Sequence, residues 1–346
     1  MRFWDREKEV KDLKAHIESE PNSILFVYGP KSSGKSTLLY RVVKELSRRK
    51  LFVQKYDVYW FDLRGVMIST YDDVVQLFFE PEGKEGQKVI SETQALFGIP
   101  NIASFSVKSA VYKEIKSKEI DPFRYMEAIL RKRRKRHIVV FDELQKLREV
   151  YMNGGNQKPV VSELFNFFVR LTKVLHLAHV IVMTSDTFFI EEVYTSSSLK
   201  NTSIYYLVDY FDDETARKIL IEEGLSKDDA EYVVNMSGGV PWVMAEVTSN
   251  GDPKEKVENL YLSFRSRLRE TFGQLYDINE KLRDECKELL KKMLKGYTPE
   301  IDGKDRKCVK LLVEREVLYY DPIKGEVRFQ TKFDRRAAEE LLIKGY

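Results

Sequence analysis

The sequence predicts an α/β fold in which helices cover both faces of a parallel β-sheet. Three observations indicate it: five short apolar runs lack polar alternation, helical spacing of apolar residues recurs between them, and a glycine-rich loop follows the first run. A strand that is buried on both faces reads as a continuous apolar run, because neither face meets water. The expected strands, all within one domain of residues 1–210, are 23–28, 56–63, 137–143, 179–186 and 203–210.

Helical spacing predicts helices at 6–20, 35–49 and 160–175 of this domain. Residues 81–120 fit neither periodicity and are expected to form an insertion.

The pattern changes after residue 210. Two stretches, FDDETARKILIEEG and SKDDAEYVVNMSGG, predict short helices that open with acidic residues, which favour the positive end of a helix dipole. Longer helices follow to about residue 295. Residues 305–330 then predict a helix, a strand, a turn and a second strand, which is the order that ends a winged helix.

Composition excludes several classes of protein. The 346 residues hold 58 Lys and Arg against 55 Asp and Glu, so the net charge of +3 excludes a chain that is a polycation throughout. With 43% apolar and 33% charged residues, the chain is not of a disordered type. The charged start MRFWDREKEVKDLK lacks a signal peptide's apolar segment, and no apolar run is long enough for a membrane span. A cytoplasmic protein without a membrane partner is therefore expected.

Cysteine and histidine usage excludes the common structural cross-links. Cys286 and Cys308 are the only cysteines, too few for a disulfide framework or a cysteine-rich zinc site, and they leave open a single disulfide or two thiols. The four histidines have no metal-ligand spacing, so no zinc site is expected.

The glycine-rich loop GPKSSGKST matches the pattern G-x-x-x-x-G-K-[ST] from Gly29 to Ser36. Between a strand and a helix, such a loop turns successive backbone N–H groups toward an anion, and the helix adds its positive end. Lys35 is expected to reach the β- and γ-phosphates, and the Ser36 hydroxyl to bind Mg²⁺. The predicted phosphate-binding residues are Gly29, Pro30, Lys31, Ser32, Ser33, Gly34, Lys35, Ser36 and Thr37.

A second acidic element follows about a hundred residues later. The run IVVFDE delivers Asp142 to the carboxyl end of the sheet, where ligands bind in open α/β folds. Asp142 is expected to hold Mg²⁺, and Glu143 to polarise an attacking water. Helix capping by the start of DELQKLRE is the alternative, and Gln145 either faces the site or lies on the surface.

The strand at 179–183 is followed by Thr184, Ser185 and Asp186. A polar side chain there, for which Ser185 is the candidate, would lie beside the γ-phosphate and orient the water. The alternative is a cap for the helix TFFIEEVY. No N-K-x-D motif follows the fourth strand, which favours adenine over guanine.

These motifs together resemble the archaeal members of the STAND class of P-loop ATPases, which are relatives of the AAA+ proteins. The resemblance covers nearly the full chain and rests on FWDREKEV, GPKSSGKST, VVFDELQ, MTSD and SGGVPW. It implies bound ATP or ADP with Mg²⁺, and an AAA+-like P-loop ATPase core (residues 1–210) followed by a helical lid (211–275) and a winged-helix domain (276–346).

The same resemblance implies an adenine pocket. Phe3, Trp4, Arg6 and Glu7 would lie near the base, and Pro241 would approach it from the lid. From the residues alone, Arg6 and Glu7 are equally well explained as charges in a first helical turn, and 238–241 as a helix stop and restart.

The sequence departs from the family in its arginines. Eukaryotic-like STAND proteins often carry an arginine after the strand that here ends in Ser185 and Asp186, and no lid arginine is evident near Gly239. Arg64, just after the second strand, is the candidate for stabilising the transition state. Without such an arginine hydrolysis should be slow, because an arginine finger is worth about 10³–10⁵ in rate.

Basic residues leave the function partly open. RKRRKR at 131–136 is either a solvated helix end or a nucleic-acid contact, and residues 281–346 hold 17 Lys and Arg against 13 Asp and Glu. Three functions remain: a Mg²⁺-dependent ATPase whose nucleotide state sets the orientation of the lid and the winged helix, an ATP-regulated DNA-binding protein with incidental hydrolysis, and a nucleotide-gated scaffold that self-associates or binds a protein partner. The candidate DNA contacts in the winged helix are Lys304, Arg306, Lys307, Lys310, Lys324 and Arg328.

Overall fold

The computed structural model describes residues 4–81, 103, 105–151, 159–195 and 199–344. Contacts divide the chain into two units. One unit holds residues 6–28 and 35–207. The other holds residues 29–34, the described part of the N-terminus before residue 6, and the chain from residue 208 onward.

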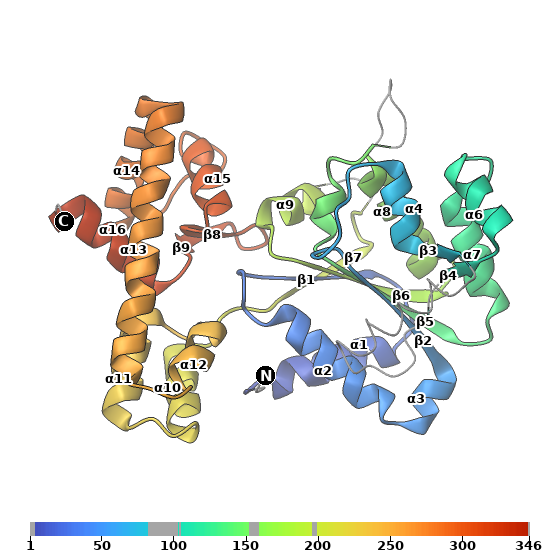
Figure 1. The fold of residues 1–346 in the computed structure, drawn as a ribbon, viewed down its shortest axis with the longest axis horizontal. Coiled ribbons are helices and arrows are strands. Elements are labelled where there is room, and N and C mark those ends of the chain that lie inside the picture. The colour runs from blue at the N-terminus through green and yellow to red at the C-terminus, as the bar shows by residue number, and fades with distance from the viewer. Residues whose placement is uncertain (1–3, 82–102, 104, 152–158, 196–198, 345–346) are drawn as a thin grey trace. The chain divides into compact units, whose positions relative to one another are not determined.

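The first unit is built on the predicted sheet, which has five strands that pair in parallel (Figure 1). This confirms the expected α/β class. In spatial order the strands are β2 (Tyr56–Asp62), β5 (Arg136–Asp142), β6 (Ala178–Thr184), β1 (Ile24–Tyr28) and β7 (Ser203–Leu207). In parallel strands all carboxyl ends lie at the same edge, so Tyr28, Asp62, Asp142 and Thr184 end together.

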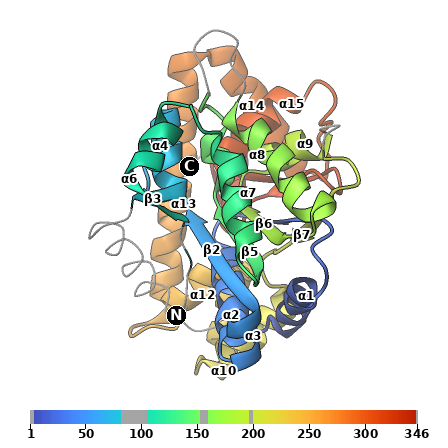
Figure 2. The same cartoon turned by 90° about the vertical axis from the view of Figure 1, so that its right-hand side faces the viewer.

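Helices cover both faces of this sheet (Figures 1 and 2). One face carries α1 (Glu7–Glu18), α2 (Lys35–Ser47) and α3 (Lys50–Lys55), and the other carries α4 (Tyr71–Phe78), α7 (Pro122–Lys132), α8 (Val160–Val169) and α9 (Thr187–Thr195). The second face packs on an aromatic core, in which the ring centroids of Phe61 and Phe141 lie 5.0 Å apart and those of Phe141 and Phe168 4.9 Å apart. Such burial on two sides explains the mainly apolar runs of β1, β2, β5 and β6, whereas the edge strand β7 is partly exposed.

Four expectations need adjustment. The strand expected at 203–210 ends at Leu207. The helix expected at 160–175 is α-helical only to Val169 and continues as a π-helical turn, Arg170–Val174. The strand expected at 179–186 ends at Thr184, so Ser185 and Asp186 lie in the loop that follows. Of the 81–120 insertion, the structure describes a small parallel pair, β3 (Phe79–Pro81) and β4 (Phe105–Val107), and a helix, α6 (Ser109–Lys116), while 82–102 and 104 lie outside the described residues.

The second unit begins with the two short helices expected from their acidic starts, α10 (Asp213–Glu222) and α11 (Lys227–Ser237). Asp212 and Ser226 cap them by accepting backbone N–H bonds of 2.9 and 3.1 Å. The unit continues with α12 (Pro241–Val247), α13 (Pro253–Ile278), α14 (Glu280–Leu294), α15 (Arg306–Glu314), the antiparallel hairpin of β8 (Leu318–Asp321) and β9 (Glu326–Phe329), and α16 (Lys332–Glu339). Helix α15 followed by this hairpin has the order of elements expected of a winged helix.

Within the described ranges, no helix combines the length and the hydropathy that crossing a bilayer requires.

Candidate nucleotide-binding site

The backbone of the glycine-rich loop has the conformation that its sequence predicts. Gly29, Ser32 and Gly34 have φ values of +150°, +59° and +94°. A Cβ on Gly29 would lie 2.2 Å from the carbonyl oxygen of Val208, so only glycine fits there. Helix α2 begins at Lys35, directly after the loop. Left-handed residues that lead into a helix N-terminus are the backbone arrangement that binds phosphate groups.

Ser36 and Asp142 lie together although 106 residues separate them in the sequence. The Ser36 hydroxyl donates a hydrogen bond of 2.7 Å to Oδ2 of Asp142, whose side chain is 2% exposed. Asp142 ends β5, as expected, and does not cap the turn that follows, because the N-cap of that turn is Glu143. The capping alternative for Asp142 is therefore wrong.

The charges at this end of the sheet influence one another. Burial lowers the pKa of Lys35 to about 8, while the negative charges of Glu143 and Asp142 act in the opposite direction. Burial raises the pKa of Asp142 to about 6, against the opposing effects of the Ser36 hydrogen bond and the Arg64 charge. One ammonium and two carboxylates thus share a weakly hydrated place at the start of α2.

Glu143 stands at the turn that leaves β5. Its φ of +63° is uncommon for a residue with a side chain, and its N–H bonds to the Met183 carbonyl at 2.9 Å. Gln145 donates to Oε2 of Glu143, and Ser185 donates to its Oε1 at 3.4 Å. Thr184 in turn donates to Gln145 at 2.8 Å. Gln145 therefore faces the site rather than the bulk surface, and these bonds hold Glu143 between two strand ends.

Asp186, by contrast, serves the helix that follows. Its Oδ1 accepts the Phe189 N–H at 2.9 Å, which is the capping role weighed for this segment, and its Oδ2 pairs with Arg148 at 3.2 Å.

The donor atoms present fit Mg²⁺ and a nucleotide phosphate. A hydroxyl and a carboxylate oxygen, 2.7 Å apart, are the hard ligands that Mg²⁺ prefers. The described ranges contain no cluster of three or more His, Cys, Asp or Glu that could enclose a metal by itself. A Mg²⁺ ion here would take its other ligands from phosphate and water, as it commonly does in phosphate-binding sites.

Comparison with known proteins identifies the family. Residues 3–247 match the family model described as an ATPase domain predominantly from Archaea. The chain belongs to this archaeal ATPase family. An uncharacterized ATP-binding protein of Methanocaldococcus jannaschii is 35% identical over 349 residues, covering 99% of this chain and 98% of its own. One of Pyrococcus abyssi is 31% identical and covers 98% of both chains.

Solved structures are similar to this chain in fold. A Walker-type ATPase of Pyrococcus abyssi superposes with a TM-score of 0.63 at 16% identity, covering 97% of this chain and 96% of its own. The ORC2 protein of Aeropyrum pernix, solved in ADPNP and ADP complexes, has a TM-score of 0.50 at 11% identity, covering 99% and 95%.

The residues implied for an adenine pocket are placed as follows. Phe3 lies outside the described residues. Trp4 donates its indole N–H to Glu223 at 2.8 Å, and Pro241 is the first residue of α12. Arg6 stands before α1 and pairs with Glu9 at 2.7 Å, a contact that the first-turn alternative also explains. A role of these residues at the base stays a prediction.

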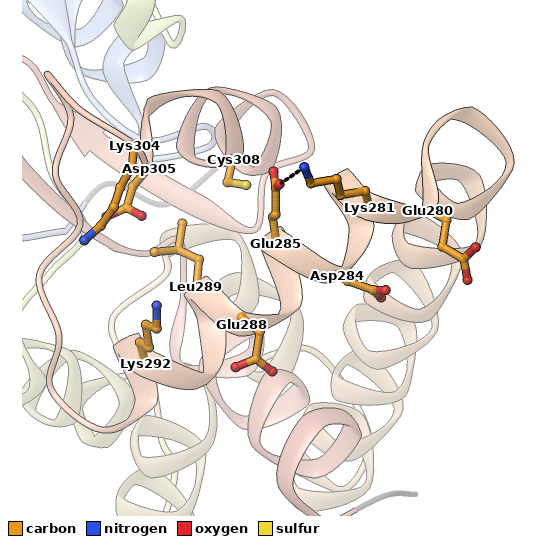
Figure 3. A pocket seen from close by; sticks show the side chains of 10 residues that line it. All are labelled: Glu280, Lys281, Asp284, Glu285, Glu288, Leu289, Lys292, Lys304, Asp305 and Cys308. Atoms are coloured by element: carbon orange, nitrogen blue, oxygen red, sulfur yellow. Dashed lines mark ion pairs between the residues drawn. The ribbon is translucent and has the colours of Figure 1, made fainter.

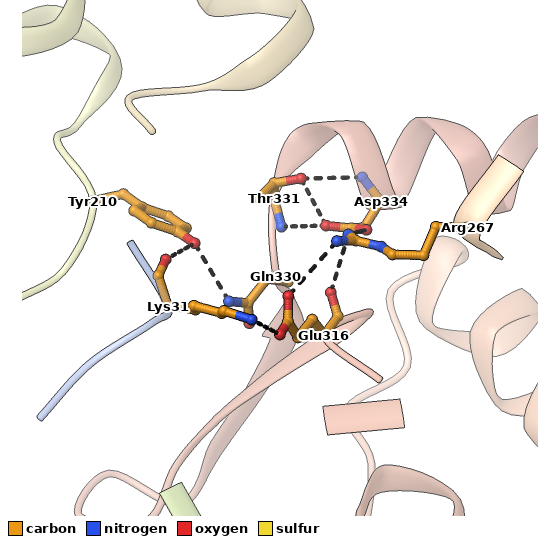
Figure 4. A network of polar contacts seen from close by, with 7 residues as sticks. All are labelled: Lys31, Tyr210, Arg267, Glu316, Gln330, Thr331 and Asp334. Carbon is orange, nitrogen blue, oxygen red and sulfur yellow. Dashed lines mark hydrogen bonds and ion pairs between the residues drawn. The ribbon is translucent and has the colours of Figure 1, made fainter. Parts of the chain in front are cut away.

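The outer part of the loop joins a polar network with the chain after residue 208 (Figure 4). Lys31 forms an ion pair with Glu316, and its carbonyl accepts the Tyr210 hydroxyl at 2.8 Å. Gln330 donates to Tyr210 at 3.3 Å. Arg267 contacts Glu316 at 3.7 Å and the buried Asp334 at 3.0 Å, so the network runs from Lys31 to the start of α16 (Figure 4).

The basic run 131–136 spans the end of α7 and the start of β5. Arg131 pairs with Glu127 at 2.8 Å, while Arg133 and Lys135 pair with Asp57 at 3.2 and 3.1 Å. These ion pairs favour the hypothesis of a solvated helix end over a nucleic-acid contact.

Sequence reasoning named Arg64 but missed its partner, Asp62. The Arg64 guanidinium bonds to Asp62 at 2.7 and 2.9 Å and to Asp142 at 2.9 Å. The available signal was that Asp62 ends a predicted strand, because polar residues at the carboxyl ends of parallel strands gather at one edge.

Proposed function

We propose that the chain is a Mg²⁺-dependent ATPase of the STAND type. The observation that carries the proposal is the 2.7 Å hydrogen bond from Ser36 to Asp142, because it joins the phosphate loop to the acidic end of β5. A hydroxyl and a carboxylate in contact are the pair that would hold Mg²⁺ beside a nucleotide's β- and γ-phosphates.

Each residue of the site has a role in this proposal. Lys35, charged through the influence of Glu143 and Asp142, would bind the phosphates as a point charge. Bound Mg²⁺ would neutralise charge that develops on the phosphate oxygens. Glu143 would accept a proton from the attacking water and orient it, held in place by Gln145 and Ser185.

Nucleotide state would be coupled to the C-terminal part of the chain. We assign residues 1–210 to the ATPase core, 211–275 to a helical lid and 276–346 to a winged-helix domain. The network of Lys31, Glu316, Tyr210 and Gln330 supports the coupling, because a bound phosphate would compete with Glu316 for the Lys31 ammonium. Loss of that ion pair would change the contacts of the segment between α15 and α16.

Phosphate release by the full chain tests the proposal. Lys35→Ala should abolish nucleotide binding. Glu143→Gln should retain ATP binding and lower turnover by about 10²–10⁴, the usual contribution of a general base. Lys50→Ala and Glu149→Gln change the same residue types at exposed positions and should behave as the unaltered chain does.

Two results would count against an ATPase. One is phosphate release by Lys35→Ala at the rate of the unaltered chain, and the other is turnover by Glu143→Gln that matches Glu149→Gln. Either would mean that the phosphate chemistry takes place elsewhere or belongs to a contaminant.

DNA binding by the C-terminal region is the second candidate. The observation that favours it is that Arg306, Lys307 and Lys310 are exposed on α15, with Lys324 exposed in the β8–β9 turn. A groove of about 930 Å³ adjoins α15, and α14 lines it with Glu280, Asp284, Glu285 and Glu288 (Figure 3). These carboxylates limit the surface of α15 that DNA phosphates could contact. Phosphates would have to approach α15 from the side away from these carboxylates.

Salt dependence of duplex binding tests this candidate. Neutralising Lys307 and Lys310 together should lower affinity and reduce the slope of log K against log salt by about 2, since each phosphate contact contributes about 0.9. Neutralising Lys281 and Lys292, which line the groove beside those carboxylates, is the matched control. A salt-independent affinity would exclude DNA as a ligand of α15.

A further inference from the structure

Arg64 is the feature that the ATPase proposal leaves without a role. It follows β2, the edge strand of the sheet, and β2 pairs with β5 so that Asp62 lies opposite Asp142. The Leu63 N–H donates to the Asp142 carbonyl at 3.1 Å. Lys146, on the turn after β5, donates to the carbonyls of Leu63 and Arg64 at 2.8 and 2.9 Å. The chain around Arg64 is therefore fixed against the end of β5 from both sides.

The guanidinium of Arg64 is held along one edge by Asp62. Its Nε donates to Oδ1 at 2.9 Å and its Nη2 donates to Oδ2 at 2.7 Å, which is the paired geometry that a carboxylate accepts best. These two bonds take two of the five N–H donors of the side chain. They raise the pKa of Arg64 further above its usual range and lower that of Asp62. Asp62 therefore fixes the orientation of the Arg64 guanidinium.

The same guanidinium also pairs with Asp142, the proposed metal ligand. Nη2 of Arg64 lies 2.9 Å from Oδ2 of Asp142, and that oxygen is the one that accepts the Ser36 hydroxyl. A Mg²⁺ ion held by Ser36 and Asp142 would compete with Arg64 for this carboxylate. It would also repel a guanidinium at hydrogen-bonding distance, because like charges so close together in a partly buried site repel strongly.

We propose that Arg64 is the arginine that stabilises the transferring phosphoryl group. We propose also that Arg64 stays paired with Asp142 until Mg²⁺ binds and displaces it. With Mg²⁺ held by Ser36 and Asp142, Arg64 would lose its contact with Asp142 and keep both bonds to Asp62. The N–H donors that Asp62 leaves unused would then be available to a terminal phosphate. Arg64 is within electrostatic range of Lys35 and Glu143, the groups assigned to the phosphates and the water. This inference rests on the proposed ATPase function and assigns it a transition-state arginine.

The ion pair between Arg64 and Asp142 has a physical reason in both states of the site. With metal absent, Arg64 neutralises the buried Asp142, which would otherwise be a costly unpaired charge. The same arginine would become available for the phosphate once Mg²⁺ and nucleotide are both bound. Its side chain, 46% exposed against 2% for Asp142, has room to move. Asp62 would be a positioning residue, since it contacts Arg64 and would act through it.

Two measurements together test the proposal. The first is kcat, and the second is the Mg²⁺ concentration that half-saturates binding of ADP, followed by calorimetry. Arg64→Ala should lower kcat by about 10³-fold or more. It should also lower the half-saturating Mg²⁺ several-fold, because the competitor for Oδ2 is gone. Asp62→Asn should lower kcat less than Arg64→Ala does. It should raise the half-saturating Mg²⁺, because an Arg64 that is not held by Asp62 pairs more tightly with Asp142.

Opposite movements of the metal requirement separate this role from a structural one, which would weaken metal binding in both variants. Arg64→Lys keeps a charge beside Asp142, but it should not restore kcat, because a single ammonium nitrogen lacks the planar fork that pairs with Asp62 and leaves fixed donors for a phosphate. Arg49→Ala, an exposed helix-flanking arginine paired with Glu18, should leave both quantities unchanged.

The proposal is overturned if Arg64→Ala keeps a near-normal kcat or raises the half-saturating Mg²⁺. It is also overturned if Arg148→Ala lowers kcat about 10³-fold while Arg64→Ala does not. A full chain that binds ADP and Mg²⁺ but releases no phosphate would instead refute the ATPase proposal. The Mg²⁺ titration would still decide whether Arg64 competes for Oδ2.

Discussion

The Ser36 hydroxyl donates to Oδ2 of Asp142 at 2.7 Å. Ser36→Ala removes one oxygen ligand and should raise the Mg²⁺ needed for ADP binding at least tenfold, while metal-free nucleotide binding changes little, because the backbone amides of the loop remain. Ser36→Thr keeps a hydroxyl and should restore the metal requirement, since the loop pattern accepts either residue. Equal Mg²⁺ requirements in the alanine and threonine variants would remove Ser36 from the metal site.

The loop's first glycine gives a prediction about fold and function together. A Cβ on Gly29 would approach the Val208 carbonyl oxygen to 2.2 Å at a φ of +150°. Gly29→Ala should therefore displace the backbone, lower the free energy of unfolding by about 1–3 kcal/mol and weaken ATP binding. Thermal melting and nucleotide titration measure the two effects.

Gly273→Ala is the matched control. Gly273 lies inside α13 with open space around its Cβ position, so alanine there should leave ATP binding unchanged and add up to about 1 kcal/mol of helix stability. If both variants bind ATP equally well, the tight path at Gly29 is not needed for the phosphate site.

The sequence predicts the sheet and the phosphate loop because both are local patterns. Five apolar runs and one glycine-rich turn need no knowledge of distant contacts. The contacts of Arg64 with Asp62 and Asp142 are different, since they depend on the register between β2 and β5, in which Asp62 lies opposite Asp142, 80 residues later in the chain. Nothing in the local pattern fixes that register.

Boundaries also escaped prediction where side chains compete with the backbone. The run at 179–186 reads as one strand, but Asp186 accepts the Phe189 N–H and so starts α9. The helix expected at 160–175 reads as continuous, but Leu175 bonds to the Arg170 carbonyl, one residue beyond the α-helical spacing. Both departures lie at the carboxyl ends of the predicted elements.

A buried histidine makes stability depend on pH. His179 in β6 lies against His16 of α1, with ring centroids 5.5 Å apart, and burial, aided by the charge of His16, lowers the pKa of His179 from 6.5 to about 4. A folded-state pKa below the unfolded value means that the unfolded chain binds the proton first. The stabilisation is complete above pH 6.5 and is lost as the pH falls toward 4, by up to about 3 kcal/mol.

His179→Gln cannot be protonated and should flatten the change in melting temperature between pH 7.5 and 4.5. His176→Asn, at an exposed position with a φ of +48° that asparagine tolerates, should keep the slope of the unaltered chain. Parallel melting curves for the glutamine variant and the unaltered chain would assign the acid sensitivity to other groups.

The two cysteines meet between α14 and α15. Cys286 and Cys308 are both buried free thiols, and the hydrogen bond between them, together with burial, raises the pKa of Cys286. Cys308 also lines the groove in Figure 3, which gives a small oxidant a route to the pair. A low-molecular-weight disulfide such as oxidised glutathione should therefore exchange with the pair, forming one Cys286–Cys308 bond and releasing two reduced thiols.

The cross-link would close a loop of about 20 residues, which stabilises a fold by about 3 kcal/mol and should raise the melting temperature of the C-terminal unit by several degrees. Mass spectrometry without reductant should show the loss of two hydrogen atoms, reversed by dithiothreitol. Cys308→Ala should show neither change. If the unaltered chain keeps two titratable thiols after oxidation under native conditions, the helices hold the sulfur atoms outside bonding geometry, and the contact is packing alone.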